Sequence, residues 1–526
     1  MHQCGHDYLV KKRGEKRVEL ERIEKRVLGG TTKSTHAFRF MLSYTKLDQF
    51  VSNYPSLAAK SALSKRVFSR IQTYFQNFIT TNYYDTSTFG FFICDTTTSS
   101  GITFTADYYA FVEPEVDSSA PYFAAAAACV FDANDKRPVI GQYILNFAYM
   151  SEKKRDEYVY FYVFLHEAMH LLGFSPDSYS SYMKSGGGTY GTSATKTKTI
   201  GSSTFTELAY PNLVSFAKSY YGSTSTFIDG VLLENGGGSG SSSAHWEKTY
   251  YPNEFMNPST EEYPIISDFT METLRATGWY TVSTQAAMEY TWGKGQGDSF
   301  FSTCPTGRGY CQASNLGQDF CSMDYRTKGV CSTYQTFYEG CNLIRDTRYI
   351  CELTFDADVI DKDSVEIYGP TSRCFEWINI QNPSFNLPKC QKAACINGNQ
   401  VLISVNGGYT FICNQGDTTV RVDSSYSIKC PDVTDFCSRF NQKCSDDCYR
   451  DGAGICLKGG NCFCFNGKKA DGTCNPDAYF TSGAIAGADS ASSKVYRPNN
   501  GGISDNSFTV FVSALVTITS LLTSYL

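Results

Sequence analysis

The placement of cysteine constrains this chain more than any other feature of its sequence. Of 21 cysteines among 526 residues, only Cys4, Cys94 and Cys129 precede residue 300, and the other eighteen lie between Cys304 and Cys474. Cysteines at that density are typical of a disulfide framework formed in an oxidising compartment. We therefore expect an extracellular or cell-surface protein whose C-terminal part is held by disulfides. Cys94 is expected to pair with Cys129.

Length and charge narrow the class of protein further. A chain of this length is expected to hold two to four domains. The net charge of −6 argues against a nucleic-acid partner, and 37 Tyr with 37 Phe argue against a disordered chain. Residues 1–30 are charged and carry three dibasic pairs, and no basic n-region or apolar h-region stands before His2, so no signal peptide is visible. Because the cysteines imply secretion, we expect the start of the chain to be truncated.

The first half of the chain predicts a mixture of helices and strands. Between residues 55 and 80, apolar residues recur with a helical period. Residues 85–110 alternate and are rich in Thr, Tyr and Phe, as strands are. Residues 139–147 are expected to form another strand, followed by a helix that starts near residue 158. This order predicts an α+β fold.

A five-residue stretch at the end of that helix, His166-Glu167-Ala168-Met169-His170, carries the main chemical signal. Residues four apart lie on one face of a helix, so both imidazoles point the same way. This spacing lets His166 and His170 bind one zinc ion, with Glu167 within reach of a metal-bound water. The stretch predicts metal-assisted hydrolysis of peptide bonds, provided that a third ligand exists. The alternative is a core helix that merely contains two histidines.

The third ligand is not at the distance that the compact zinc-peptidase pattern requires. In the metzincin pattern HExxHxxGxxH, Gly173 fits, but the third histidine would fall at Pro176. A thermolysin-type site would use a glutamate, for which Glu207 and Glu234 are candidates, although neither lies in a convincing helical pattern. His245 is the one histidine that follows the motif, so it becomes the leading candidate.

A methionine, Met256, lies eleven positions after His245, where a methionine turn beneath the metal would be expected. With it, the chain closely resembles the leishmanolysin-type metallopeptidases. The residues that carry the resemblance are His166, Glu167, His170, Gly173, the stretch His245-Trp246-Glu247 and the stretch Met256-Asn257-Pro258. In that family a large insertion precedes the third histidine, as the Gly/Ser-rich residues 176–244, expected to be surface loops, would here. The resemblance covers roughly residues 1–435.

The resemblance implies a metzincin-type catalytic domain with one zinc ion per chain. His166, His170 and His245 would bind the zinc, and Glu167 would act as the general base. Met256 would support the site without binding the metal; an ordinary core methionine is the alternative. The substrates would be proteins or peptides. By analogy with the fold, the substrate is expected to lie along residues 139–147, taken as an edge strand, and the enzyme is expected to be a monomer.

The N-terminal residues are similar to the end of a propeptide. Cys4, between His2 and His6, resembles the cysteine switch of the family. A thiolate bound to the zinc would fill its open position and keep the enzyme latent. The alternative is an unpaired or stray-paired cysteine. On this reading residues 1–37 are a propeptide remnant and residues 38–300 form the catalytic domain.

The remainder of the chain divides by composition. Residues 301–435 are expected to form a Cys-rich domain of loops and strands, within which residues 321–331 resemble the family's C-terminal domain. Residues 436–475 resemble an EGF-like module, and residues 476–506 read as a linker. The uncharged residues 507–526 fit a GPI-attachment signal better than a membrane-spanning helix. The alternatives are a surface adhesion or binding protein with a structural zinc site, and a soluble secreted peptidase.

Overall fold

The computed structural model describes residues 27–475, apart from gaps at 31–32, 85–86, 90–91, 95–96, 100–101, 121, 133, 153, 238–240, 260, 306, 334–336, 354–364, 385, 441–443, 445–447, 449–452 and 471. These residues belong to the first of the two units into which the chain divides, Met1–Phe480. The predicted switch residue Cys4, the linker at 476–506 and the tail at 507–526 lie outside the described residues. Among the helices within the described ranges, none is both long and apolar enough to cross a membrane.

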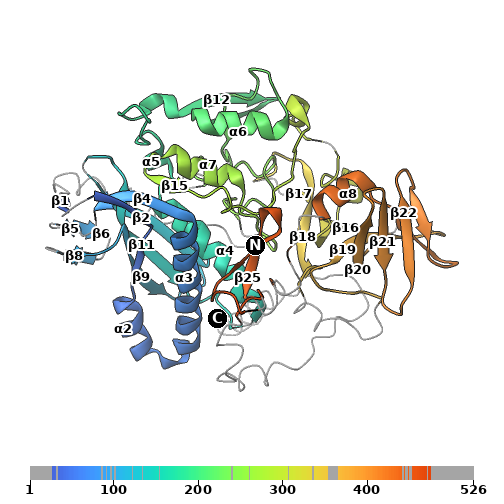
Figure 1. Cartoon of the computed structure of the whole chain (residues 1–526), viewed down its shortest axis with the longest axis horizontal. Coiled ribbons are helices and arrows are strands. Elements are labelled where there is room, and N and C mark those ends of the chain that lie inside the picture. Colours follow the sequence, from blue (N-terminus) through green and yellow to red (C-terminus); the bar gives the residue numbers. More distant parts are fainter. Residues whose placement is uncertain are drawn as a thin grey trace, which may run out of the picture. The chain divides into compact units, whose positions relative to one another are not determined.

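A four-stranded sheet with the order β10-β11-β9-β3 lies next to the motif helix (Figure 1). Its strands are β3 (Phe40–Ser43), β9 (Tyr108–Glu115), β10 (Ala124–Phe131) and β11 (Pro138–Asn146). Strands β3, β9 and β11 are parallel, whereas β10 is antiparallel to β11. Every residue of β11 is buried, as in a strand covered on both faces. The strand predicted at 139–147 is confirmed, but its predicted edge position is wrong, because β11 lies between β10 and β9.

Two long helices, α3 (Ala58–Phe78) and α4 (Lys154–Leu171), pack side by side against this sheet (Figure 1). Phe68 of α3 stacks on Phe164 of α4, with ring centroids 4.9 Å apart. The Tyr143 hydroxyl of β11 donates to the Phe164 carbonyl at 2.8 Å. The predicted helical period is confirmed: α3 follows the 3-10 turn η1 (Pro55–Leu57), and its buried face includes Val67 and Ile71.

The remaining N-terminal strands form smaller sheets. The helix α2 (Thr45–Asn53) precedes η1, and β4 (Ile79–Tyr84) lies between β2 (Lys33–Ala37) and β15 (Tyr280–Val282). The others are β1 (Val27–Gly30), β5 (Ser87–Phe89), β6 (Phe92–Cys94), β7 (Thr97–Ser99) and β8 (Ile102–Phe104). The strands predicted within 85–110 are thus confirmed. Cys129 is disulfide-bonded, but the Cys94 side chain lies outside what is described, so their pairing stays a prediction.

The segment between α4 and His245 is folded, where the sequence suggested surface loops. Its elements are α5 (Pro176–Tyr179), η2 (Gly191–Ala194), β12 (Thr195–Ile200), β13 (Ser203–Leu208), α6 (Pro211–Tyr221) and β14 (Val231–Leu232). Strands β12, β13 and β14 form one antiparallel sheet. Beyond the segment lies the helix α7 (Asp268–Ala276). Its N-cap is Ser267, and Gly278 follows its end with φ +70°.

The Cys-rich part is built from two antiparallel sheets. The first has three strands, β16 (Asp319–Cys321), β17 (Thr327–Thr333) and β18 (Asn342–Ile350). The second has the order β22-β21-β20-β19-β24-β23. Its strands are β19 (Ser372–Asn379), β20 (Asn386–Ile396), β21 (Gln400–Ser404), β22 (Thr410–Asn414), β23 (Thr419–Arg421) and β24 (Tyr426–Lys429). Short 3-10 turns, η3 (Gly297–Phe300) and η4 (Ala313–Asn315), precede them.

The predicted disulfide framework is confirmed, because all eighteen cysteines from Cys304 onward are paired. The bonds are Cys304–Cys341, Cys311–Cys331, Cys321–Cys374, Cys351–Cys390, Cys395–Cys437, Cys413–Cys430, Cys444–Cys456, Cys448–Cys462 and Cys464–Cys474. The helix α8 (Val433–Phe440) spans the predicted boundary at 435/436, and Cys437 ties it to β20. The last six cysteines therefore define a separate unit that starts at Cys444.

The segment that carries these six cysteines packs against α3 and α7. It contains β25 (Gly454–Leu457), the turn η7 (Lys458–Gly460) and β26 (Asn461–Cys464). Phe463 contacts Tyr74 and Phe78 of α3 with ring centroids 5.8 Å and 5.0 Å apart. The Lys458 ammonium binds both carboxylate oxygens of Asp268 at 2.8 Å. Its EGF-like character stays a prediction, but it is joined to the first domain by apolar and ionic contacts.

Candidate metal centre and active site

Helix α4 carries the motif at 166–170 near its C-terminal end, and the backbone then turns sharply. Gly173 has φ +115°, a conformation that residues with a Cβ rarely adopt. A Cβ at this position would also lie 2.8 Å from ring carbon Cζ3 of Trp279. The turn brings the Phe174 carbonyl back to His170, whose Nδ1 donates to it at 2.7 Å. Gly173 therefore has a geometric role in the site.

The structure brings together the three histidines that the sequence singled out as ligands. One ring nitrogen from each of His166, His170 and His245 forms a group whose members all lie within 4.8 Å of one another. The Nε2 atoms of His166 and His170 are 3.1 Å apart. All three side chains are buried, at 6%, 1% and 0% relative exposure. Three imidazoles that converge in a buried site can hold a metal ion.

The other ring nitrogen of each histidine is held by the backbone. Nδ1 of His166 donates to the Phe255 carbonyl at 2.6 Å, and Nδ1 of His245 donates to the Ser241 carbonyl at 3.1 Å. His170 is held by Phe174 in the same way. A carbonyl oxygen can only accept, so each Nδ1 carries a proton and Nε2 is the nitrogen that can bind a metal. The sequence held no signal for these carbonyl partners, because every residue has the same backbone.

Glu167 lies beside the histidines and connects the motif to the sheet. Its side chain is 1% exposed, and its Oε2 accepts a hydrogen bond from the backbone N–H of Ala126 at 2.9 Å. Ala126 belongs to the edge strand β10. The contact therefore holds a carboxylate next to the metal-binding group and next to β10, one of the two outer strands of the sheet. Sequence reasoning missed the contribution of Ala126.

The predicted methionine turn lies against the same histidines. Met256 is fully buried, and its carbonyl accepts a hydrogen bond from the backbone N–H of Trp246 at 3.1 Å. Its own N–H donates to the Glu254 carboxylate at 2.5 Å. Burial raises the pKa of Glu254 to about 7. Because the residue before Met256 is Phe255, which binds His166, the turn is linked to two of the candidate ligands.

The two glutamates considered as alternative third ligands lie in other surroundings. Glu207 belongs to β13 and is hydrogen-bonded to Asp229. Glu234 accepts hydrogen bonds from the backbone N–H groups of Gly236 at 2.7 Å and Lys248 at 3.3 Å. Burial raises the pKa of Glu234 to about 8. Neither belongs to a potential metal-binding group among the residues that the structure describes.

A comparison with known protein families is decisive at this point. The model of the leishmanolysin family, peptidase M8, matches residues 69–352, which is 284 of the 526 residues. The chain belongs to the leishmanolysin family. The matched part contains the three histidines, Glu167, Gly173 and Met256. The α+β fold and the disulfide-rich C-terminal region agree with this assignment.

Several named relatives of the leishmanolysin family are similar to the chain. The ciliated left-right organizer metallopeptidase of Danio rerio is 27% identical over 321 residues, covering 57% of this chain and 49% of the relative. The leishmanolysin-like peptidase of Caenorhabditis elegans is 24% identical over 420 residues, covering 60% and 63%. The human ciliated left-right organizer metallopeptidase is 29% identical over 266 residues, covering 48% and 33%. The chain thus spans between one third and two thirds of the length of these relatives.

The leishmanolysin family is zinc-dependent, so the site can be tested for its fit to zinc. A catalytic zinc takes three protein ligands and keeps one position open, and neutral imidazoles are among its preferred ligands. The three histidines supply that number, and each is oriented by a backbone carbonyl. They therefore fit a zinc ion. The second group of close metal-binding atoms, at Cys462, Cys464 and Cys474, is engaged in disulfides.

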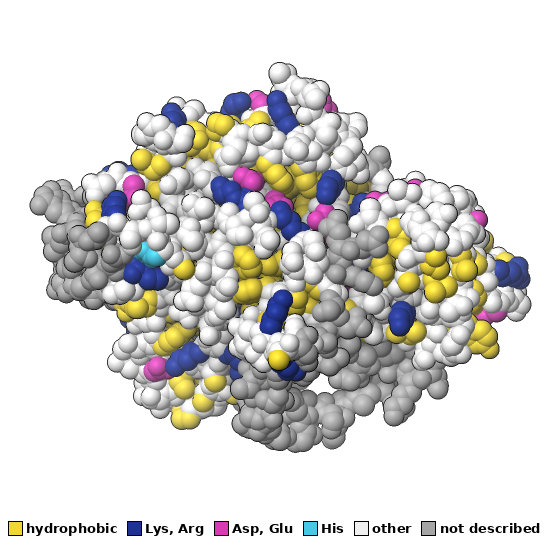
Figure 2. Space-filling view, viewed as in Figure 1, with side chains coloured by type: hydrophobic (Ala, Val, Ile, Leu, Met, Phe, Trp, Pro, Cys, Tyr) yellow, Lys and Arg dark blue, Asp and Glu magenta, His cyan; other side chains and the backbone are white. Residues whose placement is uncertain are grey.

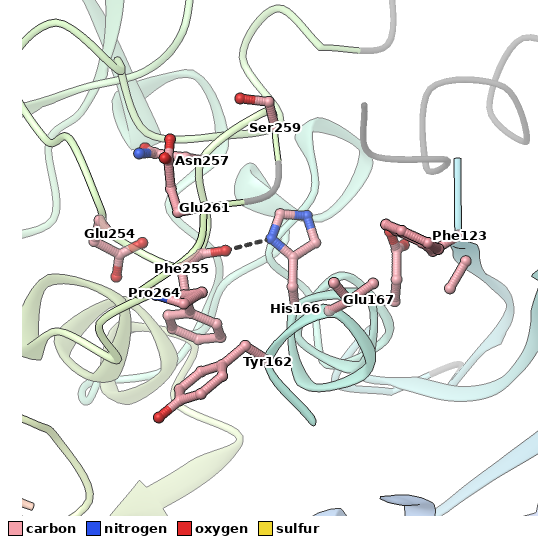
Figure 3. A pocket seen from close by; sticks show the side chains of 12 residues that line it. Phe123, Tyr162, His166, Glu167, Glu254, Phe255, Asn257, Ser259, Glu261 and Pro264 are labelled. Atoms are coloured by element: carbon pink, nitrogen blue, oxygen red, sulfur yellow. Dashed lines mark hydrogen bonds between the residues drawn. The ribbon is translucent and has the colours of Figure 1, made fainter. Parts of the chain in front are cut away.

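A pocket opens directly beside His166 and Glu167 (Figure 3). One wall comes from α4 and the residues at the start of β10, and includes Phe123. The other wall comes from the loop at 254–264, which contains the methionine turn.

Proposed function

We propose that this leishmanolysin-family chain is a zinc-dependent endopeptidase that cleaves extracellular or cell-surface proteins. The observation that carries the proposal is the convergence of His166, His170 and His245 beside the buried carboxylate of Glu167. A purely structural zinc site has no need of a carboxylate held next to its ligands. In this proposal the three histidines hold one zinc ion per chain.

The residues of the chain would divide the catalytic work as follows. When bound, zinc polarises the scissile carbonyl and lowers the pKa of a water molecule to about 7. Glu167 would accept the proton of the attacking water and pass it to the leaving amine. The hydrogen bond from Ala126 keeps the Glu167 carboxylate in place for both transfers. Met256 would support the histidines through its turn without binding the metal.

Strand β10 supports the expectation of an extended peptide substrate. It is the outer strand of its sheet in the described part of the chain, and its Ala126 contacts the proposed general base. An extended peptide can add to such an edge by main-chain hydrogen bonds. The substrate would then pass Glu167 with its backbone along β10, in place of β11 as the sequence suggested.

The proposed location of the enzyme rests on its disulfides, whereas its latency, anchor and oligomeric state are inferred from the sequence. Nine disulfides indicate an oxidising compartment, which supports an extracellular or surface location. On the face drawn in Figure 2, basic side chains lie among acidic ones. Latency through Cys4, an anchor at 507–526 and a monomeric state remain proposals. Replacing Cys4 by Ala should raise the activity of unprocessed protein.

Substitution of Glu167 by Gln tests the catalytic proposal. The amide oxygen can still accept from Ala126, so the fold and the zinc content should not change, whereas a proton acceptor is lost. We expect kcat on a protein substrate such as casein to fall about 10²- to 10⁴-fold. Zinc content is measured by mass spectrometry on the same samples.

The controls separate an enzyme from a binding protein with a structural zinc site. His245→Ala should lose both zinc and activity, which assigns the third ligand. Lys294→Ala, at an exposed ion pair with Glu289, should keep both. Equal activity in wild type and Glu167→Gln would refute the proposed mechanism. Zinc bound in full with no peptidase activity in the wild type would favour the adhesion or binding role.

A further inference from the structure

The third candidate ligand, His245, is held differently from the other two. His166 and His170 belong to α4, whose own backbone hydrogen bonds fix their positions. His245 lies outside the helices and strands of the described residues, and the sequence before it, from residue 236 to 240, contains four glycines. Glycine loses more conformational freedom on folding than any other residue, so such a segment does not hold a side chain in place by itself. The position of His245 therefore depends on contacts with other residues.

Backbone hydrogen bonds attach the segment around His245 to the chain that follows β14. The N–H of Glu234 donates to the His245 carbonyl at 2.9 Å, and the N–H of Ser243 donates to the Glu234 carbonyl at 2.7 Å. The N–H of Glu247 donates to the carbonyl of Leu232, in β14, at 3.1 Å. These bonds place His245 beside the edge of the sheet β12-β13-β14.

The side chain of Glu234 adds a second connection, on both sides of His245. One of its carboxyl oxygens accepts from the N–H of Gly236 at 2.7 Å, and the other accepts from the N–H of Lys248 at 3.3 Å. The side chain is only 1% exposed, so these hydrogen bonds are not in competition with bulk water. Gly236 precedes His245 and Lys248 follows it by three positions. One buried carboxyl group thus joins the two flanks of the candidate ligand.

The contact with Gly236 also bears on the orientation of the His245 ring. The next residue, Gly237, has φ +79° and lies so close to Ser241 that a Cβ at this position would be 2.6 Å from the Ser241 Cβ. The Ser241 carbonyl accepts the hydrogen bond from Nδ1 of His245 at 3.1 Å. Glu234 therefore acts on the backbone of His245 directly, and on its ring through Gly237 and Ser241.

We propose that Glu234 is a positioning residue of the metal centre, which holds His245 where its Nε2 meets the metal-binding atoms of His166 and His170. Glu234 belongs to no potential metal-binding group among the described residues, so this role is separate from metal ligation. Residues that orient metal ligands typically contribute a factor of about 10 to 100 in metal affinity. The inference rests on the proposed zinc site, and it gives the folded segment 176–244 a part in metal binding.

Substitution of Glu234 by Leu tests this role, because it removes both acceptors at a similar side-chain size. We expect the zinc affinity, measured by competition with a chromogenic chelator, to fall about 10- to 100-fold through faster zinc dissociation. Glu207→Leu is the matched control. Glu207 is also a buried carboxyl group of this sheet, opposite Leu232, but its hydrogen-bond partner is Asp229. This control should keep the zinc affinity of the wild type even if its melting temperature falls.

Two further measurements distinguish positioning from a general loss of stability. Saturating zinc should restore most of the kcat of Glu234→Leu, because the bound ion then holds His245 in place. If Glu234→Leu does not fold, Gly237→Ala replaces it and should also speed zinc dissociation, since its Cβ would displace Ser241.

The outcomes separate the inference from the proposed zinc site. Wild-type zinc affinity in Glu234→Leu, or an equal loss of affinity in Glu207→Leu, overturns the positioning role. The proposed site still stands in either case if His245→Ala loses zinc. Retention of zinc by His245→Ala overturns the third ligand itself.

Discussion

The catalytic part of the chain and the Cys-rich part are held together by different forces. Before residue 300, where the chain has only three cysteines, the fold depends on a large apolar core between the sheet and helices α3 and α4. The six-stranded sheet of the Cys-rich part has its own smaller core, which includes Trp377, Val401 and Phe436. The disulfides from Cys304 onward supplement it. Packing therefore positions the metal-binding histidines, whereas covalent bonds stabilise the neighbouring part.

The two parts meet at the loop that lines the pocket beside His166, residues 254–264. The Tyr263 hydroxyl donates to Glu352 at 2.9 Å and accepts from Arg326 at 2.7 Å. At the other end of the loop, the Asn253 amide donates to Asp346 at 2.6 Å. The Cys-rich part thus anchors the loop on both sides of Asn257. The comparison teaches that core packing places the histidines, whereas contacts with the Cys-rich part hold the loop that lines the pocket.

The largest effect is expected from removing the disulfide next to this contact. Cys351→Ala with Cys390→Ala opens a bond whose cysteines are 39 positions apart, which should cost about 4 kcal/mol of unfolding free energy. Because Glu352 follows Cys351, the Tyr263 anchor should be lost too. We expect a lower melting temperature and a lower kcat/KM with unchanged zinc content.

A second disulfide provides the matched control. Cys311→Ala with Cys331→Ala opens a bond with a separation of 20 positions, for a cost of about 3 kcal/mol. It lies away from Glu352, so its kcat/KM should stay close to that of the wild type. Loss of zinc in both double variants would show that zinc binding also depends on the disulfides of the Cys-rich part.

A change of pH is expected to have a smaller effect on the unfolding free energy, through a residue of the catalytic part. Burial, followed by the nearby Asp229 carboxylate, raises the pKa of Glu207 to about 7 from its usual 4.5. Because the pKa of Glu207 is higher in the folded state than in the unfolded state, protonated Glu207 stabilises the fold. This stabilisation is complete below about pH 4.5 and is lost as pH rises through 7. The change amounts to about 3 kcal/mol, because each pKa unit is worth 1.36 kcal/mol.

Urea unfolding at pH 5 and pH 8 measures this pH dependence of the unfolding free energy. Asp229, whose charge is held by Lys196 and Lys198 at 3.0 Å, has a pKa lowered to about 2 and does not titrate in this range. Glu207→Gln should remove most of the difference in unfolding free energy between the two pH values. Glu152→Gln, a partly exposed control, should leave it unchanged. An undiminished difference in Glu207→Gln would exclude this residue as its source.

Local spacing was sufficient to predict the helices that carry the site, but not the contacts between distant segments. The four-residue spacing of His166 and His170 placed them on one helix face, and the period of α3 was plain. The edge strand was misassigned because β10 is a run of alanines with weak strand propensity, while the continuous apolar run of β11 is the mark of an interior strand. The carbonyls that orient the histidines, and the partners of Tyr263, leave no trace in a single sequence.

The smallest effects are expected from two Tyr→Phe substitutions. They distinguish a contact between the two parts from a contact within the catalytic part. Tyr263→Phe removes one hydroxyl that links the pocket loop to Arg326 and Glu352, at a cost of about 1–2 kcal/mol. Tyr220→Phe removes a hydroxyl that donates to the Trp292 carbonyl at 2.8 Å within the catalytic part, at a similar cost. Both should lower the melting temperature by a few degrees and keep zinc. Only Tyr263→Phe should also raise KM, because the loop that lines the pocket loses its anchor. Equal KM values in the two variants would mean that the Cys-rich part stabilises the enzyme without shaping its pocket.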